Sequence, residues 1–299
     1  MQTWAYLNAE WITSDELHIA ADDVGFLLGA TVTERLRTFG GRLFRQEEHM
    51  ARLHRSLEIV GLDADGITRE IAAAATKFVE RNSGKIAGDD DWSVSAFATP
   101  GTSAGGRPTV CVHGHPLHFD LWADQYDSGV PVVVSSIRQI PPNSLPPELK
   151  CRSRMHYYLA DREAAASRPG ARAILLDENG LVAEATSANV LAYRNGEGLV
   201  SPPHGHILFG VSIGVVEELA AKLTVPFITR PLAVEELRRS AEAMLTSTSI
   251  CLVPIVECDG QAIAGGKPGP VYRRLLDAWS ETVGVDVAGQ ARRFATRTT

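Results

Sequence analysis

The stretch LDENGLVAEATSANVLAY, residues Leu176–Tyr193, holds the clearest local folding pattern of the chain. Its Asn-Gly pair at 179–180 separates two apolar runs, Ala173–Asp177 and Leu181–Ala185. Asn-Gly readily adopts the positive φ angles of a two-residue turn, so these runs are predicted to pair as an antiparallel hairpin. A further strand is predicted at Val190–Tyr193. The stretch therefore predicts β-sheet in the second half of the chain.

Helix and strand patterns alternate on both sides of this hairpin. Upstream, a β-branched strand at Val130–Ile137 leads through a proline-rich loop to a helix. Its buried stripe is expected to be Met155, Tyr158, Leu159 and Ala166. Downstream, a helix is predicted from Ser212, whose hydroxyl is expected to cap it. The remaining predicted elements are helices Val234–Ser240 and Pro270–Trp279, strand Ala243–Thr246, hairpin Leu252–Ile263 and a frayed tail Arg292–Thr299.

The first half also mixes the two kinds of pattern. The predicted strands are Ala5–Leu7, Leu36–Phe44, Trp92–Ala98 and Val110–His118, and the predicted helices are Gln46–Val60 and Thr68–Asn82. The polar segment Phe119–Ser128 has no clear period, which is typical of a connection between domains. We therefore expect an N-terminal α/β domain at 1–120, a linker at 121–129 and a C-terminal domain at 130–299.

Composition narrows the class of protein. The 299 residues are 44% hydrophobic and 22% charged, as in a globular chain, and the net charge of -7 disfavours a nucleic-acid partner. No apolar run is long enough for a membrane span and the N-terminus does not resemble a signal peptide, so a cytoplasmic location is expected. The four cysteines and nine histidines show no metal-binding spacing, so no metal is expected. Small-molecule chemistry is the prediction that remains.

Five segments taken together resemble one family, the fold-type IV pyridoxal-phosphate enzymes, although each segment is weak alone. They are DVGFLLGATVTERLRTFGGRLFRQEEHMARLHRS at Asp23–Ser56, PPELKCRSR at Pro146–Arg154, the opening stretch at Leu176–Tyr193, ILFGVSIGVVEELA at Ile207–Ala220 and LTSTSICLVPI at Leu245–Ile255. The resemblance implies pyridoxal 5'-phosphate as cofactor. It also implies a two-domain α/β fold, with a small N-terminal and a larger C-terminal domain, and a homodimer.

The resemblance assigns cofactor-binding roles to seven residues. Lys150 matches the Schiff-base lysine, which also moves the proton during catalysis. Glu184 matches the glutamate at the pyridine nitrogen, and Arg52 matches the phosphate-binding arginine. The other matches are Val211 and Ser212 at the phosphate, Thr248 as a hydroxyl donor and Leu208 against the ring face. Without this context, Lys150 before a helix would be read as a solvated surface charge and Glu184 as an exposed strand carboxylate.

Departures from the family affect the substrate site. Where branched-chain enzymes often have tyrosines, this chain has Leu28 and Met155, and Ser93 and Ser95 stand near positions where relatives place a tyrosine and a basic residue. The residues expected to bind substrate are Arg37, Arg154 and Ser249, and Arg35 is a second candidate for the carboxylate. An ion pair or a solvated strand edge is the alternative for both Arg35 and Arg37.

The leading hypothesis is a transaminase that moves an amino group between an amino acid or primary amine and a 2-oxo acid. It predicts ping-pong kinetics, because the enzyme carries the amino group between the two half-reactions. A lyase similar to aminodeoxychorismate lyase is the alternative, favoured by Arg154 and by the missing tyrosines. A non-catalytic binding module on the same fold is the second alternative.

Overall fold

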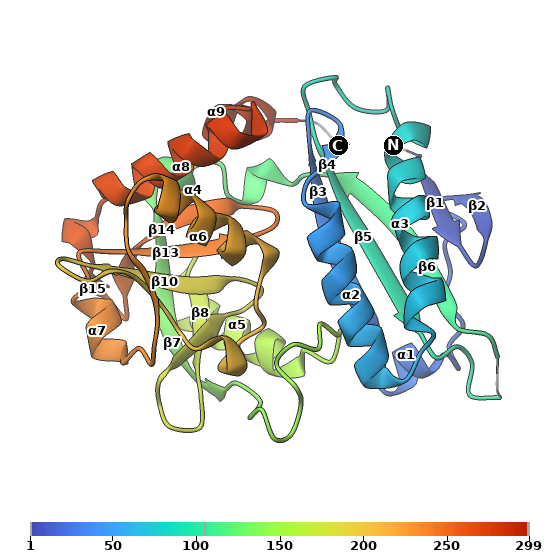
Figure 1. Cartoon of the computed structure of the whole chain (residues 1–299), viewed down its shortest axis with the longest axis horizontal. Coiled ribbons are helices and arrows are strands. Elements are labelled where there is room, and N and C mark those ends of the chain that lie inside the picture. Colours follow the sequence, from blue (N-terminus) through green and yellow to red (C-terminus); the bar gives the residue numbers. More distant parts are fainter. Residues whose placement is uncertain (1, 105, 298–299) are drawn as a thin grey trace. The chain divides into compact units, whose positions relative to one another are not determined.

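The computed structural model describes residues 2–104 and 106–297. Contacts group the chain into two compact units (Figure 1). The first contains Met1–His118, Glu148–Ser153 and Arg297–Thr299, and the second contains Phe119–Pro147 and Arg154–Thr296. The predicted domain limits stay a prediction, but the segment expected as a linker is ordered: it contains helix α4 (Gln125–Ser128), with Tyr126 buried.

The first unit is built on a six-stranded antiparallel sheet in the order β2-β1-β6-β5-β3-β4. The strands are β1 Trp4–Leu7, β2 Glu10–Thr13, β3 Val32–Phe39, β4 Arg42–Leu43, β5 Trp92–Thr99 and β6 Thr109–Pro116. The helices are α1 Val24–Leu27, α2 Gln46–Val60 and α3 Ala64–Arg81. The prediction of α2 is confirmed at both ends. Helix α3 begins four residues before the predicted Thr68, because the Asp63 side chain caps it by accepting from Gly66 N.

The two faces of this sheet have different chemistry. Helices α2 and α3 pack on one face (Figure 1), where Leu36, Val94 and Ala96 form part of the core. Gly114 on that face has no side chain because a Cβ there would lie 2.7 Å from the Phe78 ring. Since side chains alternate along a strand, the intervening residues point to the opposite face, which is polar.

The second unit contains a nine-stranded mixed sheet in the order β12-β11-β10-β13-β14-β7-β8-β9, with β15 paired to β14. The strands are β7 Val130–Arg138, β8 Arg172–Leu176, β9 Val182–Ala185, β10 Asn189–Arg194, β11 Gly198–Ser201, β12 Phe227–Thr229, β13 Glu242–Ser247, β14 Cys251–Cys258 and β15 Gln261–Ala262. The hairpins predicted around Asn179-Gly180 and at Leu252–Ile263 are confirmed as β8–β9 and β14–β15, the second turning at Asp259-Gly260.

The helices of this unit correct three predictions. They are α5 Met155–Ser167, α6 Val211–Lys222, α7 Val234–Arg238, α8 Pro270–Val283 and α9 Val287–Phe294, in addition to α4. Helix α9 occupies part of the expected frayed tail, because Asp286 caps it and Val287 and Ala291 are buried. Residues 298–299 of that tail lie outside the described chain. The expected serine cap of α6 is wrong: Gly210 is the N-cap, and Ser212 is buried inside the first turn.

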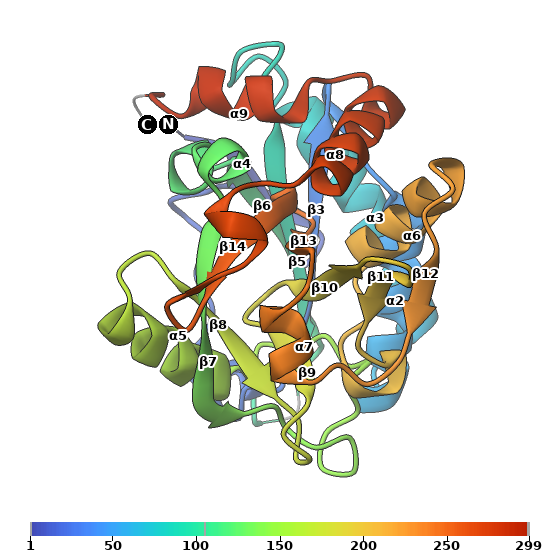
Figure 2. The same ribbon diagram turned by 90° about the vertical axis from the view of Figure 1, so that its left-hand side faces the viewer.

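The predicted buried stripe of α5 is also wrong. Helix α5 lies beside β7 and β8 (Figure 2) and packs on them through Ala160 and Ala164, which are buried. Small side chains at this i, i+4 spacing allow close approach to the sheet. Met155, Tyr158 and Leu159 are instead exposed, and so is Ala166. The sequence pattern therefore predicted the helix correctly, but the face that packs on the sheet is the one with the alanines.

Candidate active site

The peptide of Lys150 is fixed to the first unit from two sides. Its N–H donates to Ser56 Oγ on α2 at 3.1 Å, and its carbonyl accepts from Thr33 N on β3 at 2.9 Å. The next residue, Cys151, forms an isolated antiparallel bridge with Val32. The lysine is therefore held by backbone contacts to β3 and α2 although it comes from a loop, and its side chain is half-buried.

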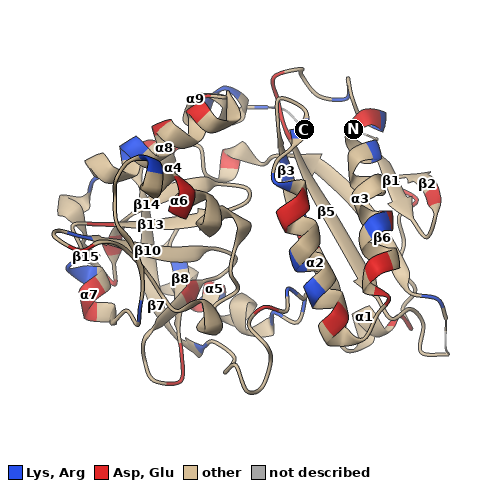
Figure 3. Ribbon diagram, in the orientation of Figure 1, with Lys and Arg blue, Asp and Glu red and all other residues tan. Residues whose placement is uncertain are grey.

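Arg52 is oriented by a buried carboxylate. It lies on α2, which carries charged residues of both signs (Figure 3), and its Nε and Nη2 donate to the two oxygens of Glu34 at 2.7 and 2.8 Å. His49 Nδ1 is 2.8 Å from Glu34 Oε2. Burial alone would raise the pKa of Glu34, but the Arg52 charge and the hydrogen bonds from His49 and Arg52 hold it well below its usual range. Glu34 therefore stays charged and fixes the guanidinium plane.

Lys150 lies near this cluster. Burial lowers the pKa of His49 against the opposing effect of Glu34, and the positive charges of Arg52 and Lys150 lower it further. A neutral His49 donates through Nδ1 to the carboxylate and adds no positive charge. The first unit thus brings together Lys150 and Arg52, two residues that the sequence assigned to the cofactor.

Glu184 is buried in the second unit with two hydrogen-bond donors. Its Oε1 accepts from the Tyr157 hydroxyl at 2.5 Å and also from Gln139 Nε2. Burial raises the pKa of Tyr157 well above its usual value, and the nearby Glu184 charge raises it further, so the hydroxyl keeps its proton. The Arg154 guanidinium lies over the Tyr157 ring, 5.2 Å from its centroid.

Asn189 connects two segments that were predicted to bind phosphate. It opens β10 and pairs in register with Thr246 near the end of β13, shortly before Thr248 and Ser249. Its side-chain Nδ2 donates to the Leu208 carbonyl at 2.9 Å. A Cβ at Gly210 would come within 2.4 Å of Asn189 Oδ1, so only glycine fits there.

The start of α6 has the features of an anion site. Its N-cap Gly210 provides no side-chain hydrogen bond to the first turn, which includes Val211 and Ser212. The first N–H groups of a helix have no partner within the helix, and its dipole favours negative charge at this end. In the neighbouring turn Thr248 and Ser249 are partly buried, and Cys251 has a φ of 57°, in the left-handed region that side chains rarely adopt.

The arginines expected at the substrate lie in different surroundings. Arg37 is 1% exposed, with its Nη2 3.9 Å from Asp91 Oδ2 and its guanidinium 4.0 Å from the centroid of the Phe39 ring. Arg35, on the same polar face of β3, is exposed and stands opposite Ser95 in the β3–β5 register. The contacts of Arg37 match the ion-pair alternative, and its role at the substrate stays a prediction.

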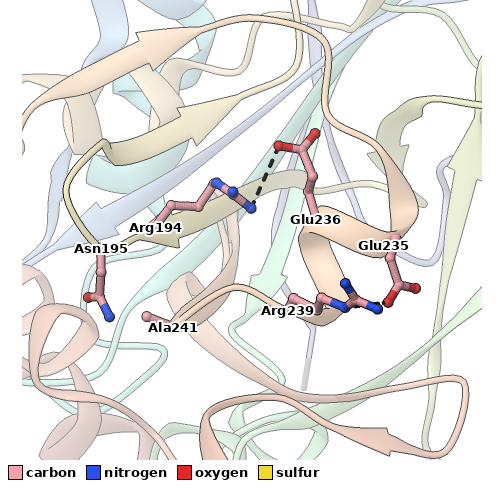
Figure 4. Close-up of a pocket in the computed structure, with 6 residues that line it drawn as sticks. All are labelled: Arg194, Asn195, Glu235, Glu236, Arg239 and Ala241. Atoms are coloured by element: carbon pink, nitrogen blue, oxygen red, sulfur yellow. Dashed lines mark ion pairs between the residues drawn. The ribbon is translucent and has the colours of Figure 1, made fainter.

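A surface pocket in the second unit contains none of the residues predicted to bind cofactor or substrate. It has a volume of about 360 Å³ and is lined by Arg194, Asn195, Glu235, Glu236, Arg239 and Ala241 (Figure 4). Its charges pair with one another, Arg194 with Glu236 at 3.6 Å and Arg239 with Glu235 at 2.7 Å. None of the predicted site residues lines it, so it is not the candidate active site.

Comparison with known families decides the assignment. The pattern of the family described as amino-transferase class IV matches residues 31–258. The chain belongs to the class IV aminotransferases. Enzymes of this family depend on pyridoxal phosphate, and the α/β fold predicted from the sequence is confirmed. Within the part of the chain that the structure describes, no helix of this aminotransferase is long and apolar enough to cross a bilayer.

Individual relatives agree with this assignment. The D-alanine aminotransferase of Staphylococcus aureus strain MW2 is 27% identical over 286 residues, which cover 93% of this chain and 97% of the relative. The branched-chain aminotransferase structure from Thermoproteus uzoniensis with norvaline has a TM-score of 0.83 at 25% identity, covering 98% of this chain and 97% of the other. The Escherichia coli branched-chain aminotransferase has a TM-score of 0.86 at 22% identity, covering 97% and 96%, which shows a shared fold.

The structure adds residues that the sequence did not single out. Glu34 and His49 support Arg52, Ser56 supports Lys150, and Asn189 connects the two predicted phosphate-binding segments. Each is a buried polar residue inside one of the matched segments. The signal in the sequence was a polar residue at a position where the periodicity predicts burial, because buried polar residues are normally hydrogen-bonded to a partner.

Proposed function

We propose that this chain is a pyridoxal-phosphate-dependent transaminase in which Lys150 holds the cofactor and moves the proton of the substrate. The observation that carries the proposal is that the Lys150 backbone is anchored to Ser56 on α2, the same helix on which Glu34 fixes the Arg52 guanidinium. Membership of the class IV aminotransferases supports the reaction type, and the names of the relatives favour transamination over the lyase alternative.

The residues present fit the cofactor. Arg52 offers an oriented cation for its phosphate, and the uncapped start of α6 offers the N–H groups of Val211 and Ser212. The buried Glu184 offers a carboxylate for its pyridine nitrogen. Thr248 would add a hydroxyl donor and Leu208 an apolar contact to the ring.

Pyridoxal phosphate, when bound, supplies an aldehyde that condenses with amines and a ring that accepts the electrons released at the substrate α-carbon. The Lys150 amine would accept the α-proton and return it. Glu184 would keep a proton on the ring nitrogen by its negative charge. Arg52 would hold the phosphate in place during each half-reaction.

The test is whether the chain holds the cofactor through Lys150. Purified protein with added pyridoxal phosphate should show the absorption of a lysine-bound cofactor. Borohydride reduction should attach the cofactor permanently, as a label, to the peptide that contains Lys150. Lys150→Ala should lose the label and the activity, whereas the control Lys77→Ala, at an exposed position of α3, should keep both. A labelled, active Lys150→Ala protein would reject the proposal.

The substrates are an amino acid and a 2-oxo acid, with a carboxylate bound by Arg35 or Arg37, Arg154 and Ser249. The similarity to D-alanine aminotransferases makes a D-amino acid the first donor to test. A panel of paired enantiomers, assayed with one oxo acid, identifies the preferred hand. Parallel lines in initial-rate plots would support the ping-pong scheme, and intersecting lines would contradict it.

We further propose that the chain forms a homodimer. The consecutive residues Phe26, Leu27 and Leu28 at the C-terminal end of helix α1 are exposed, and so, in the second unit, are Met155 and Leu159 of helix α5. Contiguous exposed apolar residues are typical of interaction surfaces. Light scattering should give twice the chain mass, and Leu28→Glu should shift the protein toward the monomer.

The cytoplasmic location also stays a prediction. The four cysteines are buried and form no disulfide.

A further inference from the structure

The sheet register of the second unit places Gln139 and Glu184 on either side of one strand. Arg138 at the end of β7 pairs with Leu176 of β8, and Gln139 N donates to the Leu176 carbonyl at 2.9 Å. On the other side of β8, Leu175 pairs with Glu184 of β9. Residues 45 positions apart are thereby brought within hydrogen-bonding distance.

The amide of Gln139 has only one satisfactory orientation. Its Oε1 accepts from Ile140 N at 3.1 Å and lies 3.0 Å from His156 Nε2. Because the oxygen is occupied by these donors, the amide nitrogen must face Glu184. Burial and the neighbouring Arg154 charge lower the pKa of His156, and its Nε2 can donate whether the ring is neutral or charged.

Tyr157 reaches the same carboxylate oxygen from helix α5. Its hydroxyl donates to Glu184 Oε1 at 2.5 Å, and it lies two residues beyond Met155, where the expected tyrosine is missing. Its ring is held by an edge-to-face contact with the His156 ring, at 4.4 Å between centroids, and by the Arg154 guanidinium over its face. Two donors on one oxygen favour the ionised form of a buried carboxylate.

We propose that Tyr157 and Gln139 are positioning residues that keep Glu184 ionised and fixed, so that the proton stays on the pyridine nitrogen of the cofactor. This inference rests on the proposed function and deepens it. If a donor is removed, Glu184 becomes more basic and draws the proton away from the ring nitrogen. The ring then accepts electrons less well, which slows the proton transfer at the substrate.

The test is Tyr157→Phe in the full chain loaded with pyridoxal phosphate labelled at its ring nitrogen. The nitrogen NMR resonance should move toward the value of an unprotonated pyridine, and kcat should fall about tenfold, the loss expected for one hydrogen bond to a charged group. Tyr158→Phe is the matched control, because Tyr158 is exposed on the same helix, and it should leave both readouts unchanged.

A second variant separates positioning from folding. Gln139→Met should shift the same resonance, and the Tyr157→Phe/Gln139→Met double variant should show non-additive losses, because both donors act on one oxygen. Circular dichroism of the cofactor-free proteins should remain that of the wild type. A folded Tyr157→Phe protein with unchanged resonance and kcat would overturn the inference alone. A wild-type protein that binds no cofactor would reject the proposed function and this inference together.

Discussion

Removal of the Glu34 carboxylate should destabilise the first unit strongly. In Glu34→Gln, the partly buried Arg52 guanidinium loses both charge-assisted contacts, at 2.7 and 2.8 Å, and His49 loses its acceptor. Removing one partner of a buried ion pair costs roughly 3–5 kcal/mol. The glutamine carbonyl can still accept one hydrogen bond and Arg52 is 13% exposed, so we expect the lower end of this range, about 3 kcal/mol.

Thermal unfolding followed by circular dichroism measures this loss. A loss of about 3 kcal/mol should lower Tm by roughly 6–12 °C. Glu58→Gln is the control, because Glu58 pairs with Arg55 on the solvent side of α2 and should change the unfolding free energy by less than about 0.5 kcal/mol. A double variant, Glu34→Gln with Arg52→Gln, should lose less than the sum of the single variants. The reasoning is refuted if Glu34→Gln and Glu58→Gln have the same Tm.

Three further predictions concern pH, the phosphate side and the substrate. The pKa of His49 is lowered in the folded chain, so the unfolded chain binds more protons, and the free energy of unfolding should fall as the pH drops below about 6.5. His49→Gln should flatten that part of a curve of Tm against pH, and an unchanged curve would contradict this prediction. Asn189→Ala should weaken cofactor binding about tenfold in a fluorescence titration, because it releases the Leu208 carbonyl; equal affinity would exclude this support role. Arg35→Gln should raise KM for the oxo acid about tenfold at unchanged Tm if Arg35 binds the carboxylate, and an unchanged KM would leave Arg37 as the candidate.

Sequence patterns predicted the helices and hairpins that are determined by neighbouring residues. Helix α2 follows from its apolar spacing, and the β8–β9 hairpin follows from Asn179-Gly180. Helix α5 was assigned correctly, but its buried face was not, since Ala160 and Ala164 carry a weaker apolar signal than Met155 and Leu159. Periodicity identifies a helix more reliably than it identifies the side that the sheet will cover.

The candidate site was predictable only in part. Resemblance to a family pointed to Lys150, Arg52 and Glu184. Spacing could not show which residues contact them, because the contacts join distant positions: Glu34 lies 18 residues from Arg52, and Tyr157 lies 27 from Glu184. Such pairs are set by strand register and helix packing, which exist only once the sheet has formed.

The lysine segment is a short excursion of the chain into the first unit, between two stretches that belong to the second. Neither unit is therefore a continuous piece of sequence. A fragment that stops at residue 120 would lack the residues that hydrogen-bond to Thr31 and Thr33, so that edge of β3 would be uncovered and the Lys150 amine would be absent. Attempts to dissect this enzyme by cutting between its halves would separate the amine from the arginine beside which it folds.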